Sequence, residues 1–160
     1  PTSPAAIQAI PLAGAVVAPA LGIEWTGHSG GIATRNGERC AVSDTTSLEQ
    51  ALLATGFPRE REREPDNNFA TFMGVKKRCR GVRRCGAAAI DLCWVADGTY
   101  DGYWERRLNA WDLAAGSAIV LAAGGQLSHL DGGAPRLHEG QLVATNGKIH
   151  PALVESIRSA

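Results

Sequence analysis

The chain has 160 residues and a mass of 16.8 kDa, enough for one hydrophobic core and short for two independent domains. Hydrophobic residues make up 44% of the chain and charged residues 20%, a composition that excludes an intrinsically disordered protein. Sixteen basic residues balance sixteen acidic ones, so the molecule as a whole exerts no strong field on nucleic acid or on an acidic membrane. We therefore expect a single globular domain over residues 1–160.

Two further patterns bear on the compartment. Apolar runs such as 13–17 and 118–123 are far shorter than the roughly 20 residues that cross a bilayer, so we expect no membrane partner. The four cysteines form no Cys-x-x-Cys pair and have no histidine at zinc-finger spacing. We interpret them as reduced thiols of a cytoplasmic protein rather than as a disulfide framework or a zinc site.

The first half of the chain begins with strands. Short apolar runs interrupted by Gly and Pro over 10–25 predict strand, turn and strand, and the glycine-rich segments 27–31 and 36–37 predict hairpin loops. Ser47 and Gln50 have capping-box spacing, which predicts a short helix from Thr46 that Gly56 and Pro58 end. Residues 59–66 alternate Arg with Glu and predict an exposed charged loop.

The second half mixes helices with strands. Helices are expected over 67–80, 87–96, 111–123 and 151–157, and strands over 100–105, 126–130 and 141–145. Because helices and strands do not follow a strict βαβ rhythm, we expect an α/β fold of layered sheets and helices, an α+β sandwich, rather than a barrel.

One segment, Glu105 to Gly116, stands out for its chemistry. Asp112 lies at the predicted start of a helix, where the helix dipole and free backbone N–H groups favour a negative charge. It is interpreted either as a capping aspartate or, together with Glu105, as part of a metal or phosphate site, since carboxylates suit hard cations and a helix start suits anions. We expect Asp112 to point into a cleft beside Glu105.

The same segment resembles the C-terminal signature of the inositol monophosphatase family of magnesium-dependent, lithium-sensitive phosphomonoesterases. The resemblance extends from about residue 10 to 157, with all motifs in the family's order and spacing. These motifs are Trp111-Asp112-x-Ala114-Ala115-Gly116-x-x-Ile119-Val120-x-x-Ala123-Gly124-Gly125, Thr55-Gly56-Phe57-Pro58, Arg84-x-Gly86-Ala87-Ala88-Ala89-Ile90-Asp91-Leu92-Cys93-x-Val95-Ala96-x-Gly98, and Asp101-Gly102-Tyr103-Trp104-Glu105.

The resemblance implies a fold, a reaction and a site. The chain is expected to form the C-terminal part of an αβαβα fold and to act, as a homodimer, on a small phosphorylated polyol such as inositol monophosphate with Mg²⁺ as cofactor. Asp112 would bind one cation and help to hold the attacking water, which fits the general logic of two-metal hydrolysis. Glu105 would hydrogen-bond the substrate's hydroxyl groups, and Gly86, Ala87 and Ala88 would form the wall that faces the ring.

The sequence departs from the family pattern in three places. Ala122 stands where the family has Glu, and Ala87 stands where it has Ser. The family's metal-binding helix glutamate and its Asp-Pro-x-Asp-Gly-Thr loop lie N-terminal to the matched region, and Asp97-Gly98-Thr99 lacks the preceding Asp-Pro. One carboxylate cannot hold a cluster of hard cations. We therefore expect activity only with the missing N-terminal half, or else a catalytically incomplete relative.

A cluster of basic residues suggests nucleic-acid binding as an alternative function. Its members are Lys76, Lys77, Arg78, Arg80, Arg83 and Arg84. Cations at this density can contact nucleic-acid phosphates, but they also suit the solvated end of a helix. Because the cluster contains no interleaved aromatic residues and the chain is neutral overall, a nucleic-acid partner is not favoured.

Overall fold

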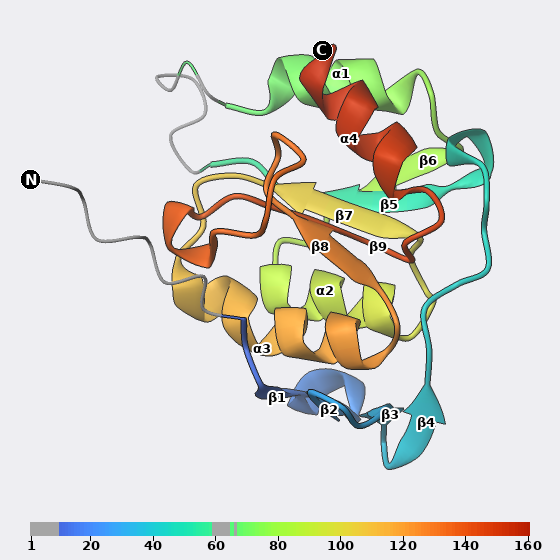
Figure 1. The fold of residues 1–160 in the computed structure, drawn as a ribbon, viewed down its shortest axis with the longest axis vertical. Helices are drawn as coiled ribbons and strands as arrows, with labels where there is room; N and C mark the ends of the chain where they lie inside the picture. Colours follow the sequence, from blue (N-terminus) through green and yellow to red (C-terminus); the bar gives the residue numbers. More distant parts are fainter. Residues whose placement is uncertain (1–9, 59–64, 66) are drawn as a thin grey trace, which may run out of the picture.

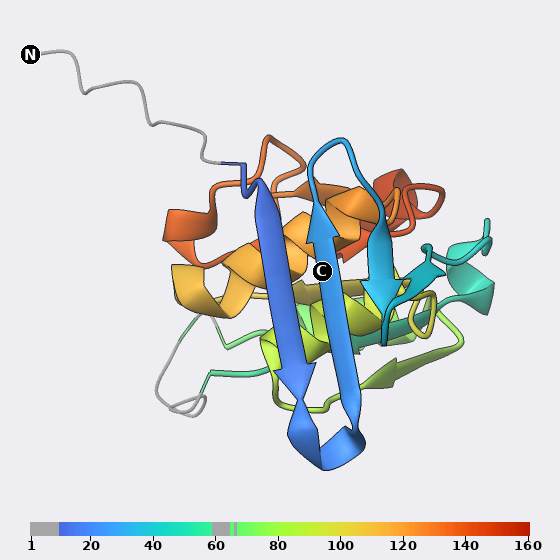
Figure 2. The same cartoon turned by 90° about the horizontal axis from the view of Figure 1, so that it is seen from below.

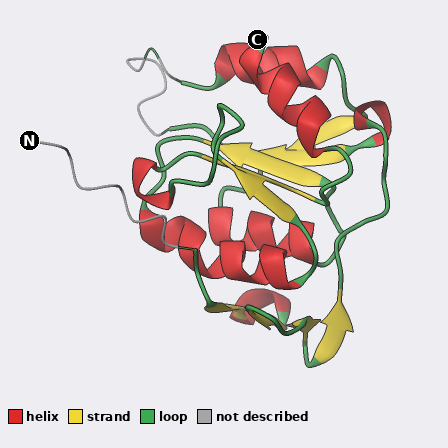
Figure 3. Cartoon of the chain, in the orientation of Figure 1, coloured by secondary structure: helices red, strands yellow, loops and turns green. Residues whose placement is uncertain are grey.

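Helices and sheets alternate in four layers (Figures 1 and 3). A computed structural model describes residues 10–58, 65 and 67–160 of the chain. The layers are a small antiparallel sheet, the helix pair α2 and α3, a mixed five-stranded sheet, and the helix pair α1 and α4. This arrangement confirms the layered α/β fold that the sequence predicts.

The elements follow one another along the chain as strands, short 3₁₀ turns (η) and helices. The strands are β1 (Ala13–Ala18), β2 (Ile23–His28), β3 (Ala33–Arg35), β4 (Glu38–Cys40), β5 (Leu52–Thr55), β6 (Gly81–Arg83), β7 (Gly102–Glu105), β8 (Gln126–Ser128) and β9 (Leu142–Thr145). The helices are α1 (Phe69–Lys76), α2 (Ala88–Ala96), α3 (Ala110–Ala122) and α4 (His150–Arg158), and the 3₁₀ turns are η1 (Pro19–Leu21), η2 (Leu48–Gln50) and η3 (Leu137–Glu139).

The first sheet is an antiparallel meander in the order β1-β2-β3-β4, and one of its faces lies on α3 (Figure 2). Alternate residues of β2 point inward, and Trp25 is fully buried, with its Nε1 donating a hydrogen bond to Asp97 Oδ2 at 2.9 Å. Alternate residues of β1 point outward, and Val17 is 62% exposed. The outward side chains of β1 are Ala13, Ala15 and Val17, whereas those of β2 are Glu24, Thr26 and His28, so the exposed apolar surface of this sheet lies along β1.

The second sheet has the order β6-β5-β7-β9-β8. Strands β6, β5 and β7 run parallel, whereas β9 pairs antiparallel with both β7 and β8. The carboxyl ends of the three parallel strands therefore lie at one edge of the sheet, where the chain continues into the connections that lead to α2 and α3. Loops at this edge are where open α/β sheets commonly bind ligands.

The helices that lie between the two sheets are apolar on most of their surface, whereas the helices on the outer face of the second sheet are apolar on one side only. Helices α2 and α3 lie between the two sheets, so Leu92 and Ile119 are fully buried and most of each helix surface is apolar. Helices α1 and α4 cover the other face of the second sheet and bury one side only, through residues such as Val75 and Leu153. None of the helices that the structure describes combines the length and apolar character needed to span a bilayer.

Most predicted elements are present, but one prediction is wrong. The helix expected from Thr46 is a single 3₁₀ turn, η2, followed by strand β5. Leu53 of that strand is fully buried between β6 and β7, so sheet pairing and burial override the local capping pattern. The charged loop expected at 59–66 lies outside the described residues except for Pro65, which is exposed.

Candidate active site

Four segments meet at the carboxyl edge of the parallel strands. Gly56 directly follows β5, and Glu105 is the last residue of β7, whose register pairs Thr55 with Trp104. The connection after β6 leads through Gly86 into α2, and the connection after β7 leads into α3. Strand topology thus brings together residues that are far apart in the sequence.

Glu105 lies half-buried at this edge, and its carboxylate has a defined partner. Tyr103 Oη donates a hydrogen bond to Glu105 Oε2 at 2.5 Å. Burial raises the pKa of the Glu105 carboxyl, and the negative charge of Asp112 raises it further, while the Tyr103 hydrogen bond and Arg84 oppose the shift. Burial, together with Glu105, also raises the pKa of Tyr103 well above its usual value, so the phenol remains a donor.

Gly56 permits this position of Glu105. A Cβ placed on Gly56 would lie only 2.0 Å from Glu105 Oε1, well inside van der Waals contact. The carboxylate therefore occupies the space that any other residue at position 56 would fill. Glu105 is consequently fixed from two sides, by the Tyr103 hydroxyl and by the backbone after β5.

The side chain of Asn68 holds the backbone of Gly56 in place through hydrogen bonds. Its buried amide Nδ2 donates to the Gly56 carbonyl at 2.7 Å and to Thr55 Oγ1 at 2.9 Å, and its Oδ1 accepts from Trp104 Nε1 at 2.9 Å. Asn68 takes a left-handed φ of 70°, which asparagine tolerates better than most residues. This one side chain connects the start of α1 with the ends of β5 and β7.

Asp112 lies in the first turn of α3 and is half-buried. Its Oδ2 accepts a hydrogen bond from the backbone N–H of Asn109 at 2.9 Å, so it does take part in capping the helix. Its charge also acts on Glu105, which places the two carboxyls in one electrostatic environment. Both interpretations of Asp112, as a cap and as a site residue, are compatible with this position, and the cleft expected beside it stays a prediction.

Gly86, Ala87 and Ala88 form the turn into α2. Gly86 has a φ of 84°, a conformation that glycine adopts without strain, and both Gly86 and Ala87 are exposed. Ala87 is the N-cap residue of α2, and Ala88 begins the helix. The three residues thus form an accessible surface at the same sheet edge as Glu105.

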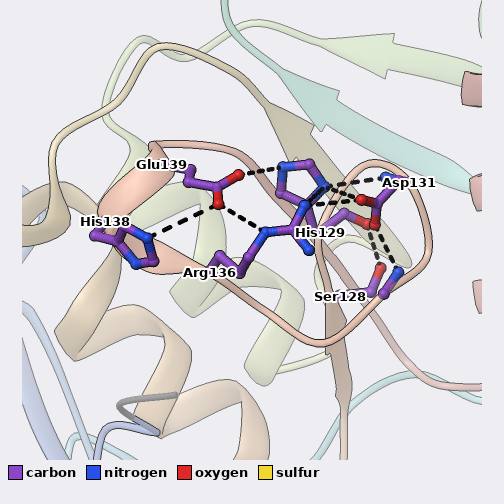
Figure 4. A network of polar contacts seen from close by, with 7 residues as sticks. Ser128, His129, Asp131, Arg136, His138 and Glu139 are labelled. Carbon is purple, nitrogen blue, oxygen red and sulfur yellow. Dashed lines mark hydrogen bonds and ion pairs between the residues drawn. The ribbon is translucent and has the colours of Figure 1, made fainter. Parts of the chain in front are cut away.

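A separate polar network holds the connection between β8 and β9 (Figure 4). The Arg136 guanidinium lies between two carboxylates, with Nη2 2.8 Å from Asp131 Oδ2 and Nε 2.8 Å from Glu139 Oε1. The His129 ring contacts the same two carboxylates, with Nδ1 3.0 Å from Asp131 Oδ2 and Nε2 3.3 Å from Glu139 Oε2. The Arg136 hydrogen bond holds the pKa of Asp131 well below its usual range. The Gly140 carbonyl that follows accepts from Leu108 N at 3.0 Å, so this connection supports the segment leading into α3.

Among the described residues, no group of three or more His, Cys, Asp and Glu side chains is arranged to hold a metal ion. Asp112 and Glu105 offer hard oxygen donors of the kind that Mg²⁺ prefers, but two carboxylates do not form a cage for a cation cluster. Asp112 and Glu105 could therefore supply some of the ligands of a Mg²⁺ site, with the other ligands coming from elsewhere.

Glu105, Asp112 and the Gly86–Ala88 turn all lie at the carboxyl edge of the parallel strands. The structure adds three residues to which the sequence assigned no role, namely Gly56, Asn68 and Tyr103. Gly56 and Tyr103 lie within the family motifs. Gly56 directly follows β5, and Tyr103 lies two residues before Glu105 in β7, so their places in the strands link them to Glu105. Asn68 lies outside those motifs. No local sequence pattern identifies it, because its partners are 12 to 36 residues away.

Comparisons with known proteins agree with this architecture. The sequence profile of the Inositol monophosphatase family matches residues 5–160. An inositol-1-monophosphatase from Synechocystis is 44% identical over 151 residues, which is 94% of this chain and 53% of the relative. The Nus factor SuhB of Pseudomonas aeruginosa is 43% identical over 137 residues, which is 84% of this chain and 51% of the relative.

A solved structure extends the agreement to three dimensions. The inositol monophosphatase from Anabaena (Nostoc) sp. PCC 7120 superposes with a TM-score of 0.92 at 40% sequence identity, covering 94% of this chain and 60% of that structure. The fold is the mixed α/β fold of that inositol monophosphatase structure. The chain belongs to the inositol monophosphatase family. It spans about half the length of the curated relatives that it matches.

Proposed function

We propose that this chain supplies one half of the active site of a Mg²⁺-dependent phosphomonoesterase that acts on a small phosphorylated polyol such as inositol monophosphate. The observation that carries the proposal is the convergence of Glu105, Asp112 and the Gly86–Ala88 turn at one sheet edge in a member of this family. We further propose that the complete enzyme is a lithium-sensitive cytoplasmic homodimer, as the family resemblance implies.

Each group has a distinct task in this proposal. Asp112 would contribute one carboxylate to the cation site, and Glu105 would accept hydrogen bonds from the substrate's hydroxyl groups. The Gly86–Ala88 turn would form the wall beside the ring. The N-termini of α2 and α3 both follow strands that end at this edge, and their dipoles favour an anionic phosphate there. A bound divalent cation neutralises phosphoryl charge and lowers the pKa of its bound water.

The remaining cation ligands would come from the N-terminal half of the family fold. Strand β1 stands at the end of the first sheet in the described part of the chain, and its outward residue Val17 is 62% exposed. Leu12, just before β1, is 72% exposed. Apolar exposure at a sheet edge is consistent with a larger fold that continues the layers there.

A chimera tests this proposal. Residues 10–160 of this chain replace the matching part of the Synechocystis inositol-1-monophosphatase, which supplies the other half. We expect Mg²⁺-dependent release of phosphate from inositol monophosphate. A panel of other phosphomonoesters, including histidinol phosphate, fructose bisphosphate and phosphoadenosine phosphate, identifies the preferred substrate. If the chimera folds but releases phosphate from no member of the panel, the proposal is wrong.

Glu105→Gln in the chimera should mainly weaken substrate binding. The amide accepts fewer hydrogen bonds than a carboxylate, so we expect KM to rise about 3- to 10-fold, the equivalent of one ordinary hydrogen bond, with a smaller change in kcat. Steady-state kinetics with inositol monophosphate give both constants. A kcat that falls 100-fold at constant KM would contradict the substrate-binding role.

Gly56→Ala should reproduce the Glu105 defect without altering Glu105 itself. The new methyl group would occupy the space of the Glu105 carboxylate, which must move and lose the Tyr103 hydrogen bond. We expect KM to rise about 10-fold. Gly81→Ala is the matched control, because a Cβ there makes only ordinary contacts at 3.5 Å. Equal KM values for the two glycine variants would contradict the role of Gly56.

The basic cluster defines the alternative function and its test. Lys76, Lys77 and Arg78 are exposed at the end of α1, so they are accessible to a nucleic acid. Neutralising all three should leave phosphatase kinetics unchanged. If this cluster instead serves nucleic-acid binding, the triple variant should weaken oligonucleotide binding and flatten its salt dependence.

A further inference from the structure

Arg107 has an unusual backbone conformation between the two carboxyls of the proposed site. Its φ of 63° lies in the left-handed region, which long side chains rarely adopt. Arg107 lies two residues after Glu105 and five residues before Asp112. A strained backbone of this kind persists only where its surroundings fix it. The segment from Glu105 to Asp112 therefore depends on contacts that hold it in this shape.

Gly140, in the connection between β8 and β9, contacts this segment directly after Arg107. Its carbonyl accepts a hydrogen bond from the Leu108 N–H at 3.0 Å. Gly140 is buried, and a Cβ placed on it would lie 2.0 Å from the Leu108 carbonyl oxygen and 2.9 Å from the Leu108 nitrogen. The two backbones therefore touch at a distance that only glycine at position 140 permits.

The contact at Leu108 reaches Asp112 through one intervening residue. Asn109 follows Leu108, and its backbone N–H donates a hydrogen bond to Asp112 Oδ2 at 2.9 Å. A displacement of Leu108 therefore moves the donor that orients the Asp112 carboxylate. Glu105, by contrast, is fixed by contacts from β5 and β7. The position of Gly140 thus affects Asp112 more than it affects Glu105.

Ion pairs fix Gly140 in turn (Figure 4). Gly140 ends the 3₁₀ turn η3, and its N–H donates to the Leu137 carbonyl at 3.2 Å. Glu139 of that turn pairs with Arg136, and Arg136 also pairs with Asp131 across the loop. Charges linked in a network hold a segment more firmly than an isolated exposed pair does.

We propose that Gly140, held by the Arg136 ion pairs, is a positioning residue of the cation site, which sets the place of the Asp112 carboxylate through Leu108 and Asn109. This inference rests on the proposed function, because that function assigns Asp112 to a cation. Catalytic groups must be held within about 0.5 Å of their productive geometry, so a displaced ligand weakens cation binding and lowers turnover.

Gly140→Ala in the chimera tests the proposal. The added methyl group would meet the Leu108 carbonyl, so the backbone before Asp112 must move. We expect the Mg²⁺ concentration that gives half-maximal rate to rise about 10-fold and kcat to fall about 10-fold. The KM for inositol monophosphate at saturating Mg²⁺ should change less than about 3-fold, because Glu105 stays in place.

Gly22→Ala is the matched control. Gly22 also ends a 3₁₀ turn with a left-handed φ, of 65°, and its N–H donates to the Pro19 carbonyl at 3.1 Å, but a Cβ there would meet nothing within 4 Å. Both variants should lose stability, because alanine is unfavourable at this φ. Only Gly140→Ala should change the Mg²⁺ dependence, and an equal change in both variants would overturn the proposal.

Arg136→Ala tests the same contact without a steric clash, and so covers the case in which Gly140→Ala does not fold. It removes the side chain that pairs with Asp131 and Glu139, and we expect the half-maximal Mg²⁺ concentration to rise about 2- to 4-fold. Lys148→Ala is its control, because it breaks the ion pair with Asp44 instead. An unchanged Mg²⁺ dependence in Arg136→Ala would overturn the proposal.

Hydrogen exchange gives a readout that does not need activity. Peptides that cover residues 106–112 should exchange faster in Arg136→Ala than in the parent chimera, because the partner of the Leu108 N–H is held less firmly. An inactive chimera would overturn the proposed function and leave this measurement to decide whether Gly140 fixes the segment. Unchanged exchange over 106–112 in Arg136→Ala would overturn the positioning role.

Discussion

Asp112→Asn in the chimera should reduce turnover of inositol monophosphate by about 10²- to 10³-fold, the largest catalytic effect expected of any substitution in this chain. The carboxylate is expected to hold a cation that neutralises charge developing on the phosphate, whereas an amide is a weak ligand for a hard cation. The Mg²⁺ concentration that gives half-maximal rate should rise as well. Initial rates over a Mg²⁺ titration measure both effects.

The capping role of Asp112 provides the control for this experiment. Its Oδ2 accepts the Asn109 N–H, and asparagine is itself a good acceptor in that position, so α3 should remain folded. Circular dichroism and the urea midpoint should therefore match the parent chimera. Full activity of Asp112→Asn at limiting Mg²⁺ would contradict the assignment of Asp112 to the cation site.

Asn68→Ala should have the largest effect on stability among the substitutions near the site. The change removes three buried hydrogen bonds and leaves Trp104 Nε1 and the Gly56 carbonyl without their partner. It also places alanine at a φ of 70°, where a Cβ is unfavourable. We expect the free energy of unfolding to fall by about 3–5 kcal/mol, measured by urea unfolding of the chimera.

Asn36→Ala separates backbone strain from the loss of buried hydrogen bonds. Asn36 also has a left-handed φ, of 51°, but its side chain is exposed and bonds to Glu24 N and the Gly22 carbonyl. Its loss should cost about 1 kcal/mol, since water can satisfy the groups that it leaves. Equal costs for the two variants would show that the buried network around Gly56 adds nothing to stability.

Local sequence patterns predict helices and strands well where burial and periodicity agree. Helix α3 starts and ends within one residue of its expected bounds, because an acidic first turn and two terminal glycines mark its limits. Strand β5 shows the opposite case: a Ser-x-x-Gln capping pattern precedes it, yet Leu53 is drawn into the centre of a parallel sheet. Pairing with β6 and β7 is a long-range effect that no local window contains.

In the candidate site, too, local patterns identify some residues and long-range contacts determine the others. Asp112 and Glu105 are noticeable in the sequence because they flank a helix start and lie seven positions apart. The neighbours that fix them are not noticeable, because Gly56 reaches Glu105 only through the register of two parallel strands. Asp91 has a raised pKa of about 7 only because folding buries it beside Glu105. Properties that arise from burial and strand register require the three-dimensional structure.

The most direct test of the central claim compares the isolated 160-residue chain with the chimera in one phosphate-release assay, with and without Mg²⁺. We expect Mg²⁺-dependent, lithium-sensitive hydrolysis of a small phosphomonoester by the chimera and almost none by the isolated chain, because the described residues provide only part of a cation site. Full Mg²⁺-dependent turnover by the isolated chain, or none by a folded chimera, would contradict the conclusion that this chain contributes one half of a phosphatase active site.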